Sequence, residues 1–69
     1  MRVTVSPRYG RDYVSAADAK AAFMENKDFT VESGSHSGAA INKADCLVYG
    51  IKFVVIRYAK RMRATEIEL

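Results

Sequence analysis

The segment Ser33-Gly34-Ser35-His36-Ser37-Gly38 brings together the side chains with which a hydrolase works. Serine beside histidine suggests nucleophilic catalysis, in which the imidazole activates the hydroxyl. A nucleophile elbow requires serine in the middle of Gly-x-Ser-x-Gly, on a strand-to-helix turn. Here the middle residue between Gly34 and Gly38 is His36. A serine- and glycine-rich segment also predicts a mobile surface loop, which would not hold side chains in attack geometry. We therefore predict a solvated loop without catalytic function.

The other reactive residue types form no catalytic or cofactor pattern. Glu66 and Glu68 share one face of a predicted strand, and cross-strand pairing with Arg57 or Arg61 accounts for them. The glycines at positions 10, 34, 38 and 50 are too scattered for a dinucleotide or Walker-type loop. We predict no enzyme, no bound cofactor and no small-molecule substrate.

Metal and disulfide chemistry is limited by one cysteine, Cys46, and one histidine, His36. A structural zinc site needs four ligands, and His36 with Asp45 is the one remaining combination. We predict no metal site. A lone cysteine cannot form a disulfide within the chain and favours a reducing compartment. We therefore predict a cytoplasmic protein in which Cys46 is a small apolar core residue.

A basic segment, Arg57-Tyr58-Ala59-Lys60-Arg61-Met62-Arg63, interleaves cations with an aromatic ring. Such cations neutralise phosphates, and a tyrosine can stack on an exposed base. A similar cluster near the N-terminus would join it if the first strand lies beside this hairpin. The alternative is that a charged hairpin tip serves solubility and protects an edge strand. The candidate nucleic-acid contacts are Arg8, Arg11, Arg57, Tyr58, Lys60, Arg61 and Arg63.

The length of 69 residues predicts a single domain, 1–69, with a small core. A chain of this size buries only roughly 60% of its unfolded surface, so association is a natural source of extra stability. No apolar stretch approaches the about 20 residues that a membrane span needs, and the first residues do not resemble a signal peptide. We predict no membrane partner.

Hydrophobic periodicity predicts four strands and one helix. Alternation marks strands over 2–6, 29–33 and 65–69, and the strand formers Phe53, Val54, Val55 and Ile56 mark a strand over 51–59. Helix formers fill 16–26 behind the candidate N-cap Ser15. Asn42-Lys43-Ala44-Asp45 is compatible with a single helical turn. We predict an α+β domain in which a small antiparallel sheet of about four strands carries one helix on a face, in the order β-α-β-β-β.

The strand over 51–59 is apolar on both faces, with Phe53 and Val55 on one side. One helix covers only one face of a sheet, so the second face needs another cover. A second copy of the chain would supply it. The alternative is that the loop over 34–50 folds over that face. An edge of the sheet is a further possible contact. The predicted subunit contacts are Val54, Ile56 and Tyr58.

These observations favour a non-enzymatic interaction or assembly module whose partner is itself, as a homo-oligomer. The alternative function is nucleic-acid binding through the basic hairpin tip. The short length and single-domain plan look like those of small proteins from phages, plasmids and other mobile elements, although no motif carries that likeness.

Overall fold

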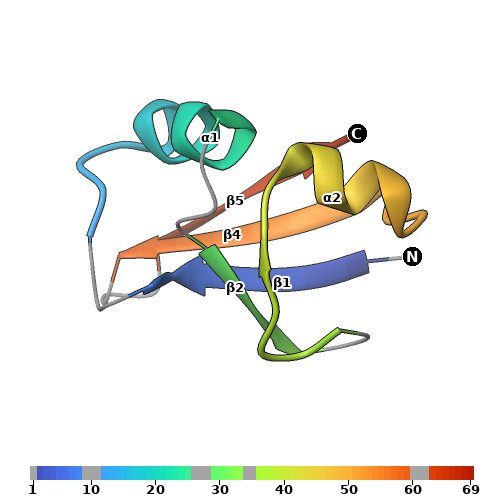
Figure 1. Ribbon diagram of the computed structural model, residues 1–69. Coiled ribbons are helices and arrows are strands. Elements are labelled where there is room, and N and C mark those ends of the chain that lie inside the picture. Colours follow the sequence, from blue (N-terminus) through green and yellow to red (C-terminus); the bar gives the residue numbers. More distant parts are fainter. Residues whose placement is uncertain (1, 9–11, 26–28, 34–35, 60–62) are drawn as a thin grey trace.

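A mixed sheet carries two short helices on one face in the computed structural model, which describes residues 2–8, 12–25, 29–33, 36–59 and 63–69 (Figure 1). Across these residues the sheet has five strands in the order β3-β2-β1-β4-β5. Strands β1 and β4 are parallel, and the other neighbours are antiparallel. The elements are β1 (Arg2–Pro7), α1 (Ala16–Glu25), β2 (Phe29–Ser33), β3 (Ala40–Ile41), α2 (Lys43–Val48), β4 (Phe53–Ala59) and β5 (Arg63–Glu68).

The α+β class is confirmed, and the predicted architecture is wrong in three details. A fifth strand, β3, joins the sheet, and a second helix, α2, precedes β4. The sheet is mixed, because β4 returns beside β1 and runs in the same direction. A two-residue strand and a six-residue helix are too short to produce a clear periodic signal. The parallel pair depends on strand order, which the periodicity of a single strand does not encode.

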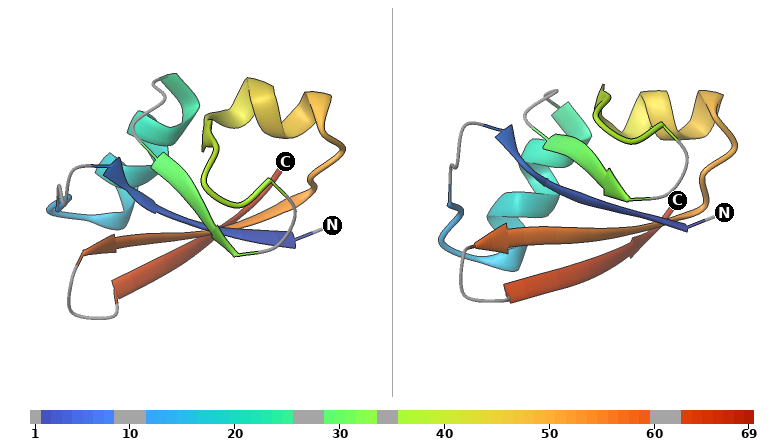
Figure 2. Two further views of the ribbon diagram at one scale, coloured as in Figure 1. Left: turned by 60° about the horizontal axis from the view of Figure 1, so that its bottom comes forward. Right: turned by 90° about the horizontal axis from the view of Figure 1, so that it is seen from below.

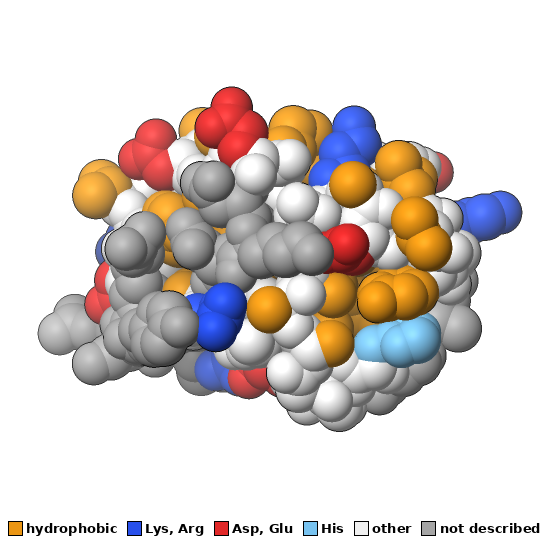
Figure 3. All heavy atoms as spheres, viewed as in Figure 1, with side chains coloured by type: hydrophobic (Ala, Val, Ile, Leu, Met, Phe, Trp, Pro, Cys, Tyr) orange, Lys and Arg blue, Asp and Glu red, His pale blue; other side chains and the backbone are white. Residues whose placement is uncertain are grey.

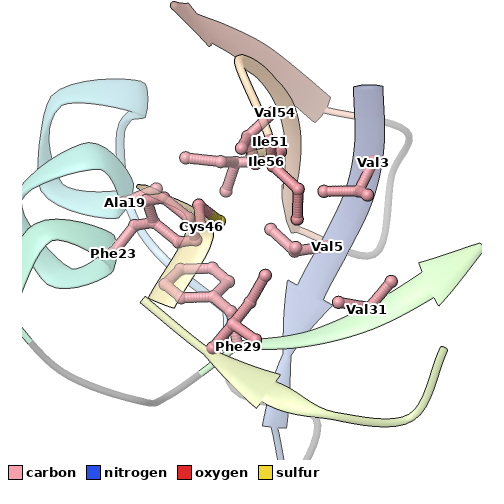
Figure 4. Close-up of a cluster of buried hydrophobic side chains, with 11 residues drawn as sticks. Val3, Val5, Ala19, Phe23, Phe29, Val31, Cys46, Ile51, Val54 and Ile56 are labelled. Carbon is pink, nitrogen blue, oxygen red and sulfur yellow. The ribbon is translucent and has the colours of Figure 1, made fainter. Parts of the chain in front are cut away.

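Both helices cover the same face of the sheet, here called the helix face, and the other is the open face (Figures 1 and 2). Buried side chains from the strands and helices meet between the two layers (Figure 4). The ring of Phe29 lies at the centre of an aromatic group, stacked on Tyr13 with centroids 5.4 Å apart and edge-on to Phe23 at 5.8 Å. The buried core residues are Val3, Val5, Ala19, Phe23, Phe29, Val31, Ile41, Cys46, Ile51, Val54 and Ile56.

Helix α1 begins where the sequence predicts. The Asp18 N–H donates to the Ser15 Oγ at 3.2 Å, so Ser15 caps one of the free donors of the first turn. Ala19 and Phe23 are its buried residues. A small side chain and an aromatic ring on one face let the helix approach the sheet closely while Phe23 fills the gap.

Helix α2 is held by a reciprocal cap at its start. The Asp45 N–H donates to the Asn42 Oδ1 at 3.1 Å, and the Asn42 N–H donates to the Asp45 Oδ2 at 3.2 Å. This capping box satisfies two backbone donors of a helix only six residues long. Cys46 is its buried residue. Because the helix starts at a defined residue, the side of α2 that carries Cys46 faces the core.

Loss of this cap should measurably destabilise the domain. We expect Asn42→Ala to lower the free energy of unfolding by about 1 kcal/mol, because it removes an N-cap acceptor. Asn42→Ser keeps an acceptor and should cost much less. Urea unfolding followed by circular dichroism measures both variants. Equal stability of Asn42→Ala and the parent chain would show that the cap does not hold α2.

The buried thiol of Cys46 gives the domain a pH dependence at alkaline pH. Burial and the nearby charge of Asp45 raise the pKa of Cys46 from 9.0 to about 11. The folded chain therefore binds this proton more tightly than the unfolded chain does. Its stabilising contribution is complete below pH 9 and is lost as the pH rises toward 11.

We expect the free energy of unfolding to fall across that window by about 1–2 kcal/mol more in the parent chain than in Cys46→Ala. Urea titrations at a series of pH values measure the difference. Parallel pH profiles for the two proteins would show that Cys46 ionises equally in both states.

Candidate interaction surface

The two faces of β4 differ in how deeply their side chains are buried. Val54 and Ile56 are both 0% exposed, and they lie in the core beneath the helices. Tyr58 packs against the same core. The predicted subunit contacts Val54, Ile56 and Tyr58 thus lie on the helix face, inside one chain. The more exposed side of β4 is the one that bears Phe53 and Val55.

Among the described residues, two ion pairs cross the open face. The Arg57 guanidinium on β4 donates to the Glu32 carboxylate on β2 at 2.8 Å, and the strand between them is β1. Arg2 on β1 pairs with Glu66 on β5, and the strand between them is β4. Each pair thus joins strands that are not neighbours. On the same face of β4, Val55 is half-buried and Phe53 is 44% exposed.

The alternative cover proposed from the sequence, the loop over 34–50, packs in its described part, 36–50, on the side of β4 that carries Val54 and Ile56. Ile41, Cys46 and Ile51 are buried in the core, and α2 sits beside α1 on the helix face. This segment therefore completes the cover of the helix face. It leaves the open face to the arginine and glutamate side chains.

The candidate nucleic-acid residues do not share one surface in the described part of the chain. Arg57 lies on the open face and is paired with Glu32, whereas Tyr58 packs on the helix face. Arg63 is exposed at the start of β5, and Arg8 is half-buried after β1. The Arg57 guanidinium and the Tyr58 ring therefore lie on opposite faces of the sheet and do not form one binding surface. The remaining candidates, Arg11, Lys60 and Arg61, fall outside the described residues.

The solvent side of α2 carries an apolar surface, here called the α2 patch. It consists of Leu47, Val48 and Tyr49, which are 57%, 81% and 42% exposed, together with the exposed Ala44. Ala44, Leu47 and Val48 have the spacing of one helix face, and none of the four side chains is charged. A helix with a buried residue on one side would normally be polar on the other. Contiguous exposed apolar side chains of this kind mark interaction sites.

His36 borders the α2 patch and extends it. Its ring is stacked on Tyr49 with centroids 4.2 Å apart and planes 16° apart. Figure 3 shows the histidine against a group of hydrophobic side chains on the same face of the molecule. The His36 backbone has φ of 64°, a left-handed conformation that only a few per cent of non-glycine residues adopt. The ring thus lies on Tyr49 from an exposed turn over 36–38.

The sequence contains a signal for the α2 patch that periodicity alone does not reveal. Asn42 and Asp45 are the two residues of a capping box, and a helix begun at Asn42 places Cys46 inward. The same helix turns Leu47 and Val48 outward. Considered only as a short apolar run, these residues suggest core rather than surface.

Comparison with known proteins gives no relative. No family model matches the chain, and no curated protein and no solved structure shows significant similarity to it. No helix in the described residues has the length and apolar character needed to cross a membrane. Within the same residues, no three histidine, cysteine, aspartate or glutamate side chains gather as metal ligands would.

Proposed function

We propose that this chain is a non-enzymatic interaction module that binds a protein partner through the α2 patch. The observation that carries the proposal is the outward apolar side of α2, where Leu47 and Val48 are exposed although the helix already buries Cys46 against the core. Burying a valine or leucine side chain stabilises a complex by about 1.5–3 kcal/mol. The patch therefore supplies binding energy that the isolated chain leaves unused.

The size of the patch favours a short segment as its occupant. A stable protein interface buries about 800 Å² on each partner. That area is close to a fifth of the chain's whole accessible surface of 4283 Å². Four side chains on a six-residue helix cover much less than this. A single helix of the partner, laid along α2 with its own apolar residues at i, i+3 and i+4, matches the patch in length and spacing.

The charge of the two helices predicts which residues flank the apolar stripe of the partner helix. The two helices carry two lysines, at 20 and 43, against three carboxylates, at 18, 25 and 45, a balance of −1. The rest of the chain is positive, since the total is +3. An approaching helix would therefore be favoured by basic residues beside its apolar stripe. The proposed partner is an amphipathic helix with a basic polar face.

A selection experiment tests this proposal directly. A library of displayed random peptides is selected on the folded chain, with the Leu47→Ser/Val48→Ser variant as the counter-selection target. We expect enriched peptides with apolar residues at helical spacing and with lysine or arginine between them. When such a peptide is titrated into the labelled chain, the largest amide shift changes should map to α2 and His36. Enrichment of no sequence, or shifts confined to the open face, would overturn the proposal.

Nucleic-acid binding is a second proposal, which rests on the exposed Arg63 and the neighbouring cations in the sequence. Retention on immobilised single-stranded DNA that weakens linearly with the logarithm of salt concentration would support it. The pairing of Arg57 with Glu32 argues against a strong effect, because that cation is already partly neutralised.

A further inference from the structure

The two edges of the sheet differ in a way that bears on self-association. The edge strand β3 has two residues, whereas the edge strand β5 has six and contains no proline. Its pairing with β4 is regular from Phe53↔Glu68 to Arg57↔Ala64, and the one irregularity lies beyond Arg57. Figure 2 shows β5 along the border of the sheet. A long regular edge offers a row of unpaired backbone groups to another strand.

The hydrogen bonds of β5 show which of its backbone groups are free to pair. The Leu69 N–H donates to the Lys52 carbonyl at 2.8 Å. In an antiparallel ladder, alternate residues exchange hydrogen bonds with the partner strand. Thr65 and Ile67 therefore turn their N–H and C=O groups toward β4, as Leu69 does. The groups of Ala64, Glu66 and Glu68 point away from the sheet.

Side chains along this edge also favour an added strand. Ile67 and Leu69 pack against the core but are only half-buried, because no strand lies beyond β5 in the described residues. The ends of the edge have opposite charge, with Arg63 at the start of β5 and Glu66 and Glu68 toward its end. A second copy running antiparallel would place the basic end of each strand beside the acidic end of the other. A parallel copy would place like charges together.

We infer that two copies of the chain pair through β5 as an antiparallel, two-fold symmetric dimer with Thr65 at its centre. Three registers use at least two of the three outward-facing residues of each copy. A centre at Glu66 places this carboxylate opposite its own copy, and a centre at Ile67 places Glu66 opposite Glu68. Directly opposed like charges destabilise a strand pair. With Thr65 at the centre, Ala64 of one copy faces Glu66 of the other, so charge selects this register.

The dimer would present two α2 patches from one assembly. Pairing by a two-fold axis perpendicular to the sheet keeps both helix layers on the same side of a continuous sheet. A partner with two helices, or a dimeric partner, would then bind with higher avidity than either site alone provides. A single strand-to-strand contact is smaller than a typical stable interface, so we expect a dimer that dissociates in the micromolar range.

Sedimentation equilibrium of the full chain over micromolar to millimolar concentrations tests the dimer. We expect the mass to rise from the 7.7 kDa monomer toward twice that value. Ala64→Pro removes an N–H that only the dimer uses, and proline is tolerated on an edge at such a position. This variant should stay monomeric at every concentration. A parent chain that remains monomeric throughout, or an Ala64→Pro variant that still dimerises, would overturn the inference.

Single cysteines test the register independently of the proline variant. In a Cys46→Ala background, we expect Thr65→Cys to form an intermolecular disulfide under mild oxidation much faster than Glu66→Cys or Ile67→Cys. The two Thr65 positions would be a close non-hydrogen-bonded pair. Fastest crosslinking at 66 or 67 would contradict the Thr65 register. Helix-peptide binding to monomeric Ala64→Pro should keep its single-site affinity, so failure of the dimer and failure of the α2 patch give different results.

Discussion

Val54→Asp should unfold the chain, whereas Val55→Asp at the next position should leave it folded. Val54 is 0% exposed on the helix face, so a carboxylate there is buried without a partner. An uncompensated buried charge costs about 3–5 kcal/mol. At roughly 0.05–0.15 kcal/mol per residue, that cost is comparable to the whole stability of a chain this short. Circular dichroism and an amide NMR spectrum at 25 °C distinguish the two outcomes.

Val55 serves as a matched control, since it lies on the same strand with the opposite orientation. It is half-buried on the open face and paired in register with Glu66, so Val55→Asp adds one like-charge contact. We expect it to lower the free energy of unfolding by about 1 kcal/mol. A folded monomeric Val54→Asp protein would mean that this side chain faces a subunit contact, as predicted from the sequence. Unfolding of both variants would show that the open face is covered.

Phe29→Ala should be the most destabilising truncation in the aromatic group. The Phe29 ring is fully buried and contacts both Tyr13 and Phe23, so its removal leaves a cavity between α1 and the sheet. Truncation of a buried phenylalanine costs about 3–5 kcal/mol. We expect largely unfolded protein at 25 °C, measured by urea titration or, if no folded baseline remains, by loss of NMR shift dispersion.

Phe53→Ala makes the same chemical change on the open face, where the side chain is 44% exposed. We expect this variant to remain folded and to lose no more than about 1 kcal/mol. Equal destabilisation by the two substitutions would contradict the assignment of the core to the helix face.

Local signals in the sequence were sufficient for the longer elements. Alternation placed β1 and β2, and Ser15 marked the start of α1. Strand β4 was predicted from its consecutive strand-forming residues. These features depend on contacts within a few residues along the chain, which is why one sequence reveals them.

Features that depend on strand order could not be predicted in this way. Strand β4 is apolar on both faces, so its sequence does not indicate which face the helices cover. On the open face, Arg57 reaches Glu32 across β1, and this contact spans 25 positions in the sequence. Similarly, the α2 patch depends on a short helix whose start is fixed by two capping side chains. A short apolar run such as 46–49 does not by itself indicate which of its side chains face the core and which face solvent.

The proposed surfaces separate two roles on a very small chain. The α2 patch would hold a partner helix, and the β5 edge would hold a second copy. Each has its own variants, so partner binding and self-association can be lost independently. The open face, with its Arg57–Glu32 and Arg2–Glu66 pairs, would remain in solvent in both states.

The most direct test of the central claim compares two exposed valines. Val48, 81% exposed, lies in the α2 patch, and Val14, 86% exposed, lies in the segment that precedes α1. Figure 1 shows this segment at the end of the helix layer away from α2. Calorimetric titration of the selected helix peptide into Val48→Asp should show a loss of affinity of at least about tenfold, because a charge replaces a buried apolar contact. Val14→Asp should bind within about twofold of the parent chain. Equal affinities for Val48→Asp and the parent chain would contradict the assignment of partner binding to the α2 patch.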